Sequence, residues 1–153
     1  MATTESQNND ILFKEIDLIE DCIKRMASNS FLLKGWAVTV LSILLGLMAN
    51  FHSWQLGSLL AIFVCVVFWY LDAVYLKLER LYTRKYNWVI QKRKHTDNYQ
   101  FNLDPFEKNM WLESESQDIG LIDVMFSWSL LPLYATMLIV GSSGLWMPCI
   151  WKI

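Results

Sequence analysis

The sequence predicts an all-α membrane protein with about three transmembrane helices, a hairpin plus one, and with amphipathic cytoplasmic helices. Of its 153 residues, enough for one domain, 54% are hydrophobic and only 18% are charged, whereas about a quarter of the residues of soluble domains are charged. Long apolar stretches occupy residues 36–51, 56–71 and 119–140. Basic residues avoid these stretches, and the positive-inside rule then places the N-terminus and residues 72–118 in the cytoplasm.

The N-terminal part of the chain is predicted to lie in water. Residues 1–9 are polar, and we expect them to be disordered. Residues 10–29 are expected to form a cytoplasmic amphipathic helix, because apolar side chains recur at helical spacing at Leu12, Ile16, Ile19, Ile23 and Met26. Asn9 or Asp10 is the expected N-cap, and the polar "SNS" at 28–30 is expected to interrupt the helix.

Residues 30–71 are predicted to form a transmembrane hairpin. Each of its two uncharged stretches has 16 residues. A bilayer needs about 20 residues, so a soluble buried helical hairpin is the alternative. The connector "FHSWQ" is short and has no basic residue, so the chain can only turn back. Lys34 and Asp72 each lie 19 residues from Ser53 at the predicted tip. We therefore expect these opposite charges to meet at the same depth, with the stem of Lys34 reaching the membrane border.

Residues 72–118 are predicted to be a cytoplasmic helical extension followed by a loop. The helix of the second span should continue past Asp72 to about residue 92, because no Gly or Pro interrupts it. The "DPFE" at 104–107 predicts the start of a further short helix, with Asp as the cap, Pro at the first helical position and Glu at the third.

Basic side chains beside the second span form a predicted cytoplasmic basic patch. Its members are Lys77, Arg80, Arg84 and Lys85. Aromatic residues lie among them, which is compatible with binding of nucleic acid. Directly beside a span, however, each basic residue gains about 1 kcal/mol from anionic lipid head groups. We therefore expect the lipid bilayer as the partner, with RNA or a nucleotide as the weaker alternative.

Residues 119–141 are predicted to form the third transmembrane helix. Pro132 should kink it, which neighbouring helices can tolerate in a membrane. The "GSSG" at 141–144 should end it and leave residues 142–153 as a short apolar tail. If Pro132 instead marks a re-entrant turn, the C-terminus stays on the cytoplasmic side.

Small residues recur four apart in both helices of the predicted hairpin. They are Ser42 and Gly46 in the first helix, and Gly57 and Ala61 in the second. Such patterns let helix backbones approach closely in lipid. The approach can occur within the hairpin or between subunits. Because a three-span protein of this size has a small interior, we expect a homo-oligomer.

Two groups of polar residues in the predicted spans are candidate functional sites. A charge at the hydrocarbon border is unfavourable unless it is paired, so Lys34 and Asp72 are expected to form an ion pair. This pair can lock the hairpin or act as a gate or subunit contact. Asp123 and Ser127 can form a polar strip, with Tyr134 further along the same face. The alternative is an interfacial aspartate near a helix start, where the helix dipole favours an anion.

The sequence contains no pattern typical of an enzyme. His52 and His95 have no Cys or acidic cluster nearby at ligand spacing, and no Gly-rich phosphate loop follows a strand. The cysteines, Cys22, Cys65 and Cys149, are far apart and are expected to be unreactive buried thiols. We therefore expect no catalytic residue, cofactor or metal.

Two stretches resemble a family of small bacterial multi-pass membrane proteins of phage-defence neighbourhoods. They are "MASNSFLLKGWAVTVL" at 26–41 and "FWYLDAVYLKLERLYTRKYNWV" at 68–89. The family comprises accessory membrane proteins encoded beside type VI-B CRISPR–Cas effectors and beside the RADAR ATPase–deaminase pair. The resemblance covers residues 10–95 and, more loosely, the third span. It implies a bacterial inner-membrane protein that assists or executes defence, and it carries no catalytic motif.

These observations lead to two hypotheses about function. The first is a non-enzymatic membrane effector that oligomerises through its spans and, by forming a pore or otherwise perturbing membrane integrity, compromises the inner membrane during infection. The second is a membrane-anchored adaptor that recruits or regulates a cytosolic defence nuclease, ATPase or deaminase complex. A transporter subunit is a weaker third option, since no ionisable relay crosses the spans.

Overall fold

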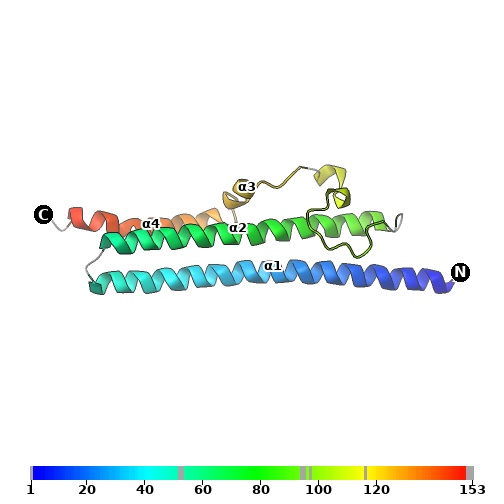
Figure 1. Ribbon diagram of the computed structural model, residues 1–153, viewed down its shortest axis with the longest axis horizontal. Helices are drawn as coiled ribbons and strands as arrows, with labels where there is room; N and C mark the ends of the chain where they lie inside the picture. The colour runs from blue at the N-terminus through cyan, green and yellow to red at the C-terminus, as the bar shows by residue number, and fades with distance from the viewer. Residues whose placement is uncertain (1, 52–53, 94–95, 97, 116, 151–153) are drawn as a thin grey trace. The chain divides into compact units, whose positions relative to one another are not determined.

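The computed structural model describes residues 2–51, 54–93, 96, 98–115 and 117–150. The predicted all-α class is confirmed, since 83% of the residues are helical and no strand occurs in the described part of the chain. The elements are α1 (Ala2–Phe51), α2 (Trp54–Lys92), the 3-10 turns η2 (Lys108–Met110) and η3 (Glu113–Glu115), α3 (Leu121–Met125) and α4 (Leu131–Ile150) (Figure 1). The chain divides into two compact units: a first unit of residues 1–28 and 75–119, and a second unit of residues 29–74 and 120–153.

Helix α1 runs without a break, which corrects two predictions about the N-terminal region. It begins at Ala2 rather than after a cap at Asn9 or Asp10, and residues 2–9 contain no Gly or Pro that would stop a helix. The helix also passes through the break expected at 28–30. Ser30 does not cap a new helix there, because its hydroxyl is buried and donates a hydrogen bond to another side chain.

One face of α1 is buried with an 11-residue repeat. The buried residues on this face are Glu15, Ile19, Met26, Ser30, Ala37, Leu41 and Met48. Eleven residues in three turns give about 3.67 residues per turn, close to the 3.6 of an α-helix. The spacing of these residues in the sequence is therefore what keeps one face of the helix inside each unit.

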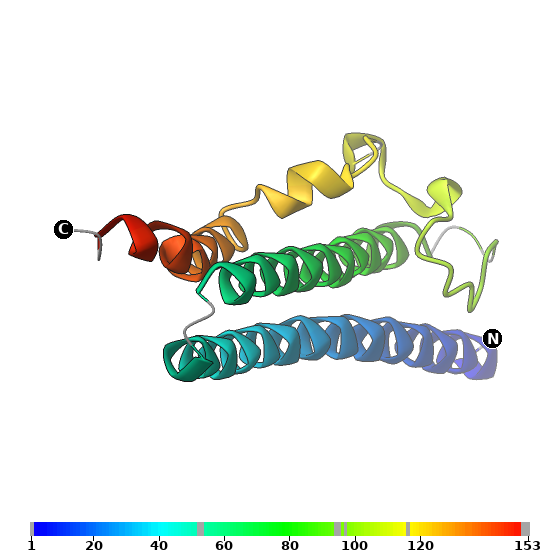
Figure 2. The same ribbon diagram turned by 60° about the vertical axis from the view of Figure 1, so that its left-hand side comes forward.

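In the second unit, α1 and α2 lie side by side in opposite directions and α4 packs against them (Figures 1 and 2). Small residues allow α4 to approach closely. A Cβ atom added to Gly141 would lie 3.3 Å from the Cβ of Ala61 and 3.7 Å from the side chain of Leu41. A Cβ atom added to Gly144 would collide with the hydroxyl of Ser58. These two glycines are therefore packing positions of α4.

The predicted third span is divided into two helices, which corrects the expectation of one kinked helix over residues 119–141. Helix α3 has five residues, and α4 begins at Leu131 and continues to Ile150. Pro132 lies in the first turn of α4, where its missing N–H leaves no hydrogen bond broken, so it begins this helix rather than kinking it. The "GSSG" does not end the helix either, because its glycines pack against α1 and α2. Most of the predicted tail, residues 142–153, is thus part of α4.

The first unit packs the beginning of α1 against the end of α2. Its core consists of Ile19, Trp88, Val89 and Met110. Helix α2 reaches Lys92 in one piece, which confirms that the helix of the predicted second span continues well beyond Asp72.

The short helix predicted after "DPFE" is replaced by the two 3-10 turns η2 and η3. The carboxylate of Asp104 does accept a hydrogen bond from the backbone N–H of Phe106 at 3.0 Å. The backbone N–H of Asp104, however, donates to the side chain of Asn102 at 2.8 Å. Glu107 accepts from Asn109 instead of returning to this N–H group. The reciprocal capping box is therefore absent, and a regular helix does not start here.

Candidate functional site

A polar cluster in the otherwise apolar second unit is the candidate functional site. Asp72 of α2 is fully buried, and Lys34 Nζ of α1 lies 3.0 Å from its Oδ1 and 2.8 Å from its Oδ2. Ser30, one turn before Lys34, donates to Asp72 Oδ1 at 2.5 Å and accepts from Lys34 Nζ at 2.7 Å. The structure thus brings together the two charges that the spacing around the hairpin tip predicted to meet.

Helix α4 supplies a further partner of the Asp72 carboxylate. Tyr134 is fully buried, and its hydroxyl donates to Asp72 Oδ2 at 3.1 Å. The ring of Trp69 stacks on Tyr134 with 6.0 Å between centroids, and its Nε1 donates to the carbonyl oxygen of Met125 at 3.0 Å. Sequence reasoning assigned Tyr134 to a different polar face and Ser30 to a cap. In the sequence, the position of Ser30 one helical turn before Lys34 could have indicated that it joins this ion pair.

Partners from two helices, α1 and α4, satisfy the buried charge of Asp72 on α2. Each carboxylate oxygen accepts two hydrogen bonds, with the Lys34 ammonium contributing to both. An unpaired buried charge is strongly unfavourable, and removing one member of a buried ion pair costs about 3–5 kcal/mol. Lys34 retains 26% exposure of its side chain, so the ammonium lies at the edge of the protein. The arrangement joins α1, α2 and α4 at one level.

The four small residues of the hairpin occupy two different environments. Ala61 is buried, and Gly57 lies directly against the side chain of Met48. Gly57 and Ala61 therefore pack within the chain. Ser42 and Gly46 are on the exposed side of α1, and a Cβ atom added to Gly46 would meet no atom within 4 Å. Packing within the hairpin therefore applies to Gly57 and Ala61, and a subunit contact through Ser42 and Gly46 stays a prediction.

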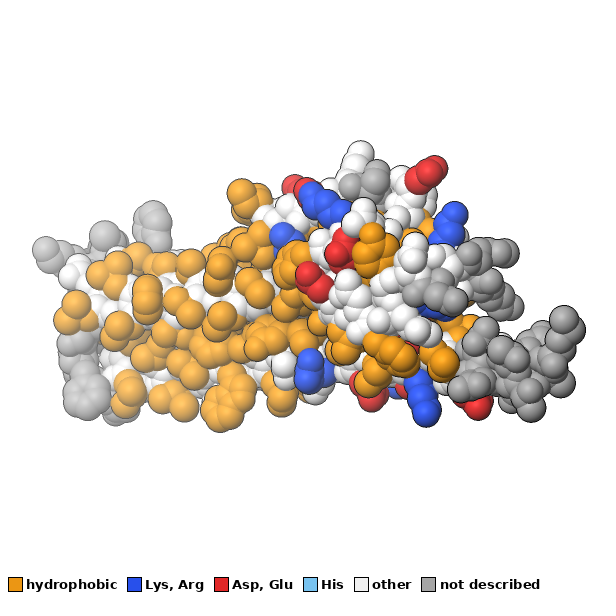
Figure 3. All heavy atoms as spheres, turned by 45° about the vertical axis from the view of Figure 1, so that its right-hand side comes forward, with side chains coloured by type: hydrophobic (Ala, Val, Ile, Leu, Met, Phe, Trp, Pro, Cys, Tyr) orange, Lys and Arg blue, Asp and Glu red, His pale blue; other side chains and the backbone are white. Residues whose placement is uncertain are grey.

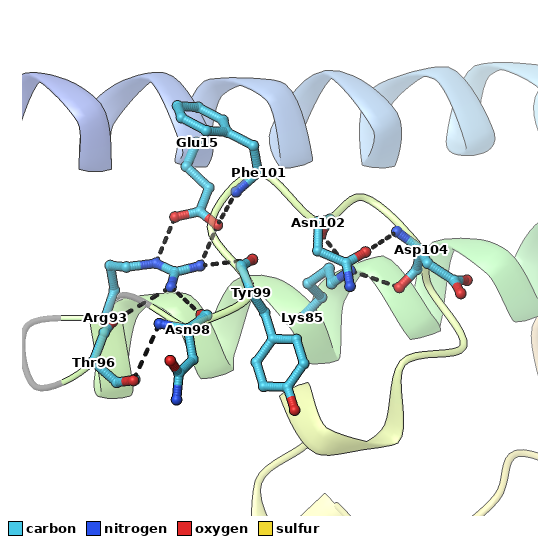
Figure 4. A network of polar contacts seen from close by, with 9 residues as sticks. All are labelled: Glu15, Lys85, Arg93, Thr96, Asn98, Tyr99, Phe101, Asn102 and Asp104. Carbon is cyan, nitrogen blue, oxygen red and sulfur yellow. Dashed lines mark hydrogen bonds and ion pairs between the residues drawn. The ribbon is translucent and has the colours of Figure 1, made fainter.

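Only part of the predicted basic patch is on the surface. Lys85, which was predicted to belong to it, is buried. Lys85 is 1% exposed, and its ammonium donates to the backbone carbonyls of Asn102 at 2.5 Å and Asp104 at 2.6 Å (Figure 4). Burial lowers the pKa of Lys85, while the charge of Asp104 acts in the opposite direction. Lys85 therefore fixes the following loop. The other members, which are partly exposed, are Lys77, Arg80 and Arg84.

A second buried ion pair, which the sequence did not indicate, holds the loop after α2 (Figure 4). Arg93 donates from Nε to Glu15 Oε2 at 2.6 Å, and from a terminal nitrogen to Glu15 Oε1. Arg93 also reaches the carbonyls of Asn98 at 2.6 Å and Tyr99 at 3.2 Å. Glu15 accepts from the backbone N–H of Phe101 at 3.2 Å. Tyr99 and Phe101 have φ angles of 60° and 55°, which bulky residues rarely adopt, so the ion pair holds a strained loop.

Asp123 and Ser127 do not form the polar strip considered in the sequence. Asp123 is exposed in the first turn of α3 beside Gly120, which matches the alternative of an aspartate near a helix start. Ser127 lies in the turn after α3, and its buried hydroxyl has no hydrogen-bond partner among the described residues. Tyr134 points to Asp72 instead. The broken third span therefore separates these residues.

The remaining candidate residues add no chemistry to the cluster. Cys65 is buried and Cys22 is partly buried, and both are free thiols. The structure does not describe the side chain of Cys149. Three positions discussed above lie outside the described residues: His52, Ser53 and His95. Within the described ranges, no group of three or more His, Cys, Asp or Glu side chains could hold a metal ion.

The surface of the second unit is strongly apolar. It carries 20 of the 26 exposed large hydrophobic side chains in the described part of the molecule. Its charged residues in that part are Lys34, Asp72 and Asp123. Figure 3 shows hydrophobic side chains covering this unit on the visible face, while Lys, Arg, Asp and Glu gather over the first unit. Two helices, Asn9–Met48 and Trp54–Lys92, are long and apolar enough to cross a membrane.

Comparisons with known proteins identify no relative of this chain. No protein-family model matches it, and neither a curated protein nor a solved structure is significantly similar to it.

Proposed function

We propose that the chain is a bacterial inner-membrane protein with a cytoplasmic N-terminus, which oligomerises and compromises the membrane in an anti-phage defence system. The observation that carries the membrane location is the apolar surface of the second unit. In the most apolar 18 residues of each of the two long helices, only 17% and 22% of the residues are buried. The core helix of a soluble protein, in contrast, is mostly buried. Lipid is the solvent that favours such a surface.

The distribution of charge supports the same location. Lys34 and Asp72 compensate each other where the apolar surface ends, as intramembrane charges usually do. Helix α4 has 20 residues without a charged side chain, so we assign the third crossing to it rather than to residues 119–141. The proposed role in phage defence depends only on the resemblance of residues 26–41 and 68–89 to the family of small bacterial membrane proteins.

A specific observation favours the adaptor as the second candidate. The loop after α2 exposes the large hydrophobic side chains of Tyr99 and Phe101. The Arg93–Glu15 pair and Lys85 fix its backbone. A rigid loop with exposed aromatic residues is suited to binding a protein partner. In this alternative the membrane helices only anchor the chain.

Membrane depolarisation during infection distinguishes the two candidates. Bacteria that express the chain should lose their membrane potential after phage infection, as followed with a potential-sensitive dye, because an assembled effector opens a path for ions. Cells that express the Asp72→Lys variant should keep their potential, since the three-helix contact is lost. Protection from phage with an intact potential would contradict the effector and favour the adaptor.

Self-association should depend on the exposed face of α1 and not on the small residues buried in the unit. A Cβ atom added to Gly35 would meet no atom within 4 Å, and Ser42 is exposed two turns further on the same side. Gly35→Leu together with Ser42→Leu should therefore reduce cross-linking between subunits and leave the thermal midpoint unchanged. The matched variant Gly144→Leu should lower the midpoint by several degrees, because it collides with Ser58. Unchanged cross-linking in the α1 double variant would exclude this face as the subunit contact.

A further inference from the structure

Two basic side chains of the first unit, Arg84 and Lys108, contact the segment that contains Asp118. Lys108 Nζ lies 2.7 Å from Asp118 Oδ2, and Arg84 donates to the carbonyl oxygen of the preceding residue, Gln117, at 2.6 Å. The hydrogen bond from Lys108 lowers the pKa of Asp118, and the charges of Lys108, Lys77 and Arg84 lower it further. The Asp118 carboxylate thus pairs with Lys108, while Arg84 beside it donates to a neutral carbonyl.

An aromatic ring forms the floor of this group. The guanidinium of Arg84 lies 5.4 Å from the ring centre of Trp111, and the ammonium of Lys108 lies 5.7 Å from it. Such cation–π contacts restrain both cations near the ring. The basic groups come from α2 and from η2, so residues far apart in the sequence converge on one position.

The present occupant of the position is weakly held. The Lys108 and Asp118 side chains are 66% and 67% exposed. Exposed ion pairs contribute little to stability, because water screens them. A phosphate group has more acceptor oxygens than the Asp118 carboxylate, so it is suited to replace this carboxylate beside Lys108.

We propose that Arg84, Lys108 and Trp111 form a binding site for a phosphate-bearing anion, with the head group of an acidic phospholipid as its source, and that Asp118 is an internal competitor for this site. The short distance in sequence between the site and the apolar second unit favours lipid as the source. Asp118 precedes the second unit by two residues in the sequence. The lipid assignment rests on the proposed membrane location, whereas the phosphate site itself does not.

Calorimetric titration of the full-length protein in uncharged detergent micelles tests the site. The probes are short-chain phosphatidylglycerol, short-chain phosphatidylcholine and inorganic phosphate. Each basic residue near an anionic head group contributes about 1 kcal/mol, or about fivefold in affinity. Lys108→Gln should weaken binding of phosphatidylglycerol about fivefold, and Asp118→Asn should strengthen it by up to about fivefold. Lys92→Gln, the matched removal of an exposed charge on α2, should leave the affinity unchanged.

Several results would overturn the proposal. An unaltered affinity for phosphatidylglycerol in Asp118→Asn would show that Asp118 does not compete for the site. An equal loss of affinity in Lys92→Gln and Lys108→Gln would show that Lys108 is not part of a specific site. Phosphatidylcholine binding as tightly as phosphatidylglycerol would exclude recognition of an anion. Inorganic phosphate binding as tightly, with the same response to the variants, would support the phosphate site and reject lipid as its source. Stronger competition by an RNA oligonucleotide would assign the surface to nucleic acid. None of these titrations measures membrane potential, so their outcome is independent of the depolarisation experiment.

Discussion

Replacing Asp72 with lysine is expected to destabilise the second unit by about 3–5 kcal/mol, the effect of breaking a buried ion pair. The variant places a second ammonium beside Lys34 and removes the acceptor of the Ser30 and Tyr134 hydroxyls. The free energy of unfolding, measured by titration with a denaturing detergent and followed by tryptophan fluorescence, gives this value directly. We also expect loss of the depolarisation phenotype in the same variant.

The charge-swapped double variant separates the pair from a general effect of charge. Lys34→Asp combined with Asp72→Lys should recover part of the lost stability, because opposite charges face each other again. Recovery is expected to be incomplete, since the Tyr134 hydroxyl must then accept a hydrogen bond rather than donate one. The matched control is Asp123→Lys, which changes an exposed acidic residue of the same unit and should cost less than about 1 kcal/mol. A double variant as unstable as Asp72→Lys would mean that the two residues do not act as a pair.

The ion pair could be predicted because it depends on chain length and charge alone. An antiparallel hairpin brings residues at equal distances from its tip to the same level, and two isolated charges in apolar sequence have few other partners. The long continuation of α2 was predictable for a similar reason, since no residue in it interrupts a helix. The all-α class followed from the same long apolar stretches.

The differences between prediction and structure come from tertiary contacts that local sequence does not encode. The "GSSG" of α4 has the composition of a helix end, but its glycines allow close packing against Ala61 and Ser58 and remain helical. Lys85 has the composition of a surface cation, but loop carbonyls surround its ammonium. The Glu15–Arg93 pair joins residues 78 apart, and each lies among other charged residues, so charge alone did not distinguish them.

Replacing Glu15 with glutamine is expected to release the loop after α2. The Arg93 guanidinium would remain 6% exposed without a compensating charge, which costs about 3–5 kcal/mol. Tyr99 and Phe101 adopt left-handed backbone angles, and such residues persist only where their surroundings hold them. Amide hydrogen exchange of Phe101 should therefore accelerate by about 100-fold or more, in line with this loss of local stability. Exchange in α4 should be unchanged, since α4 belongs to the second unit.

A double-mutant cycle distinguishes the ion pair from simple packing of the two side chains. Glu15→Met with Arg93→Met leaves no buried charge, so the double variant should be more stable than the sum of the single losses predicts. Lys24→Gln is the matched control because it removes an exposed ion pair with Glu20 on the same helix, where about 0.3–0.5 kcal/mol is expected. If Glu15→Gln altered the exchange of Phe101 no more than Lys24→Gln did, the loop would be held by other contacts. The ion pair would then not explain why the loop with the exposed Tyr99 and Phe101 is rigid. The observation that favours the adaptor would be lost with it.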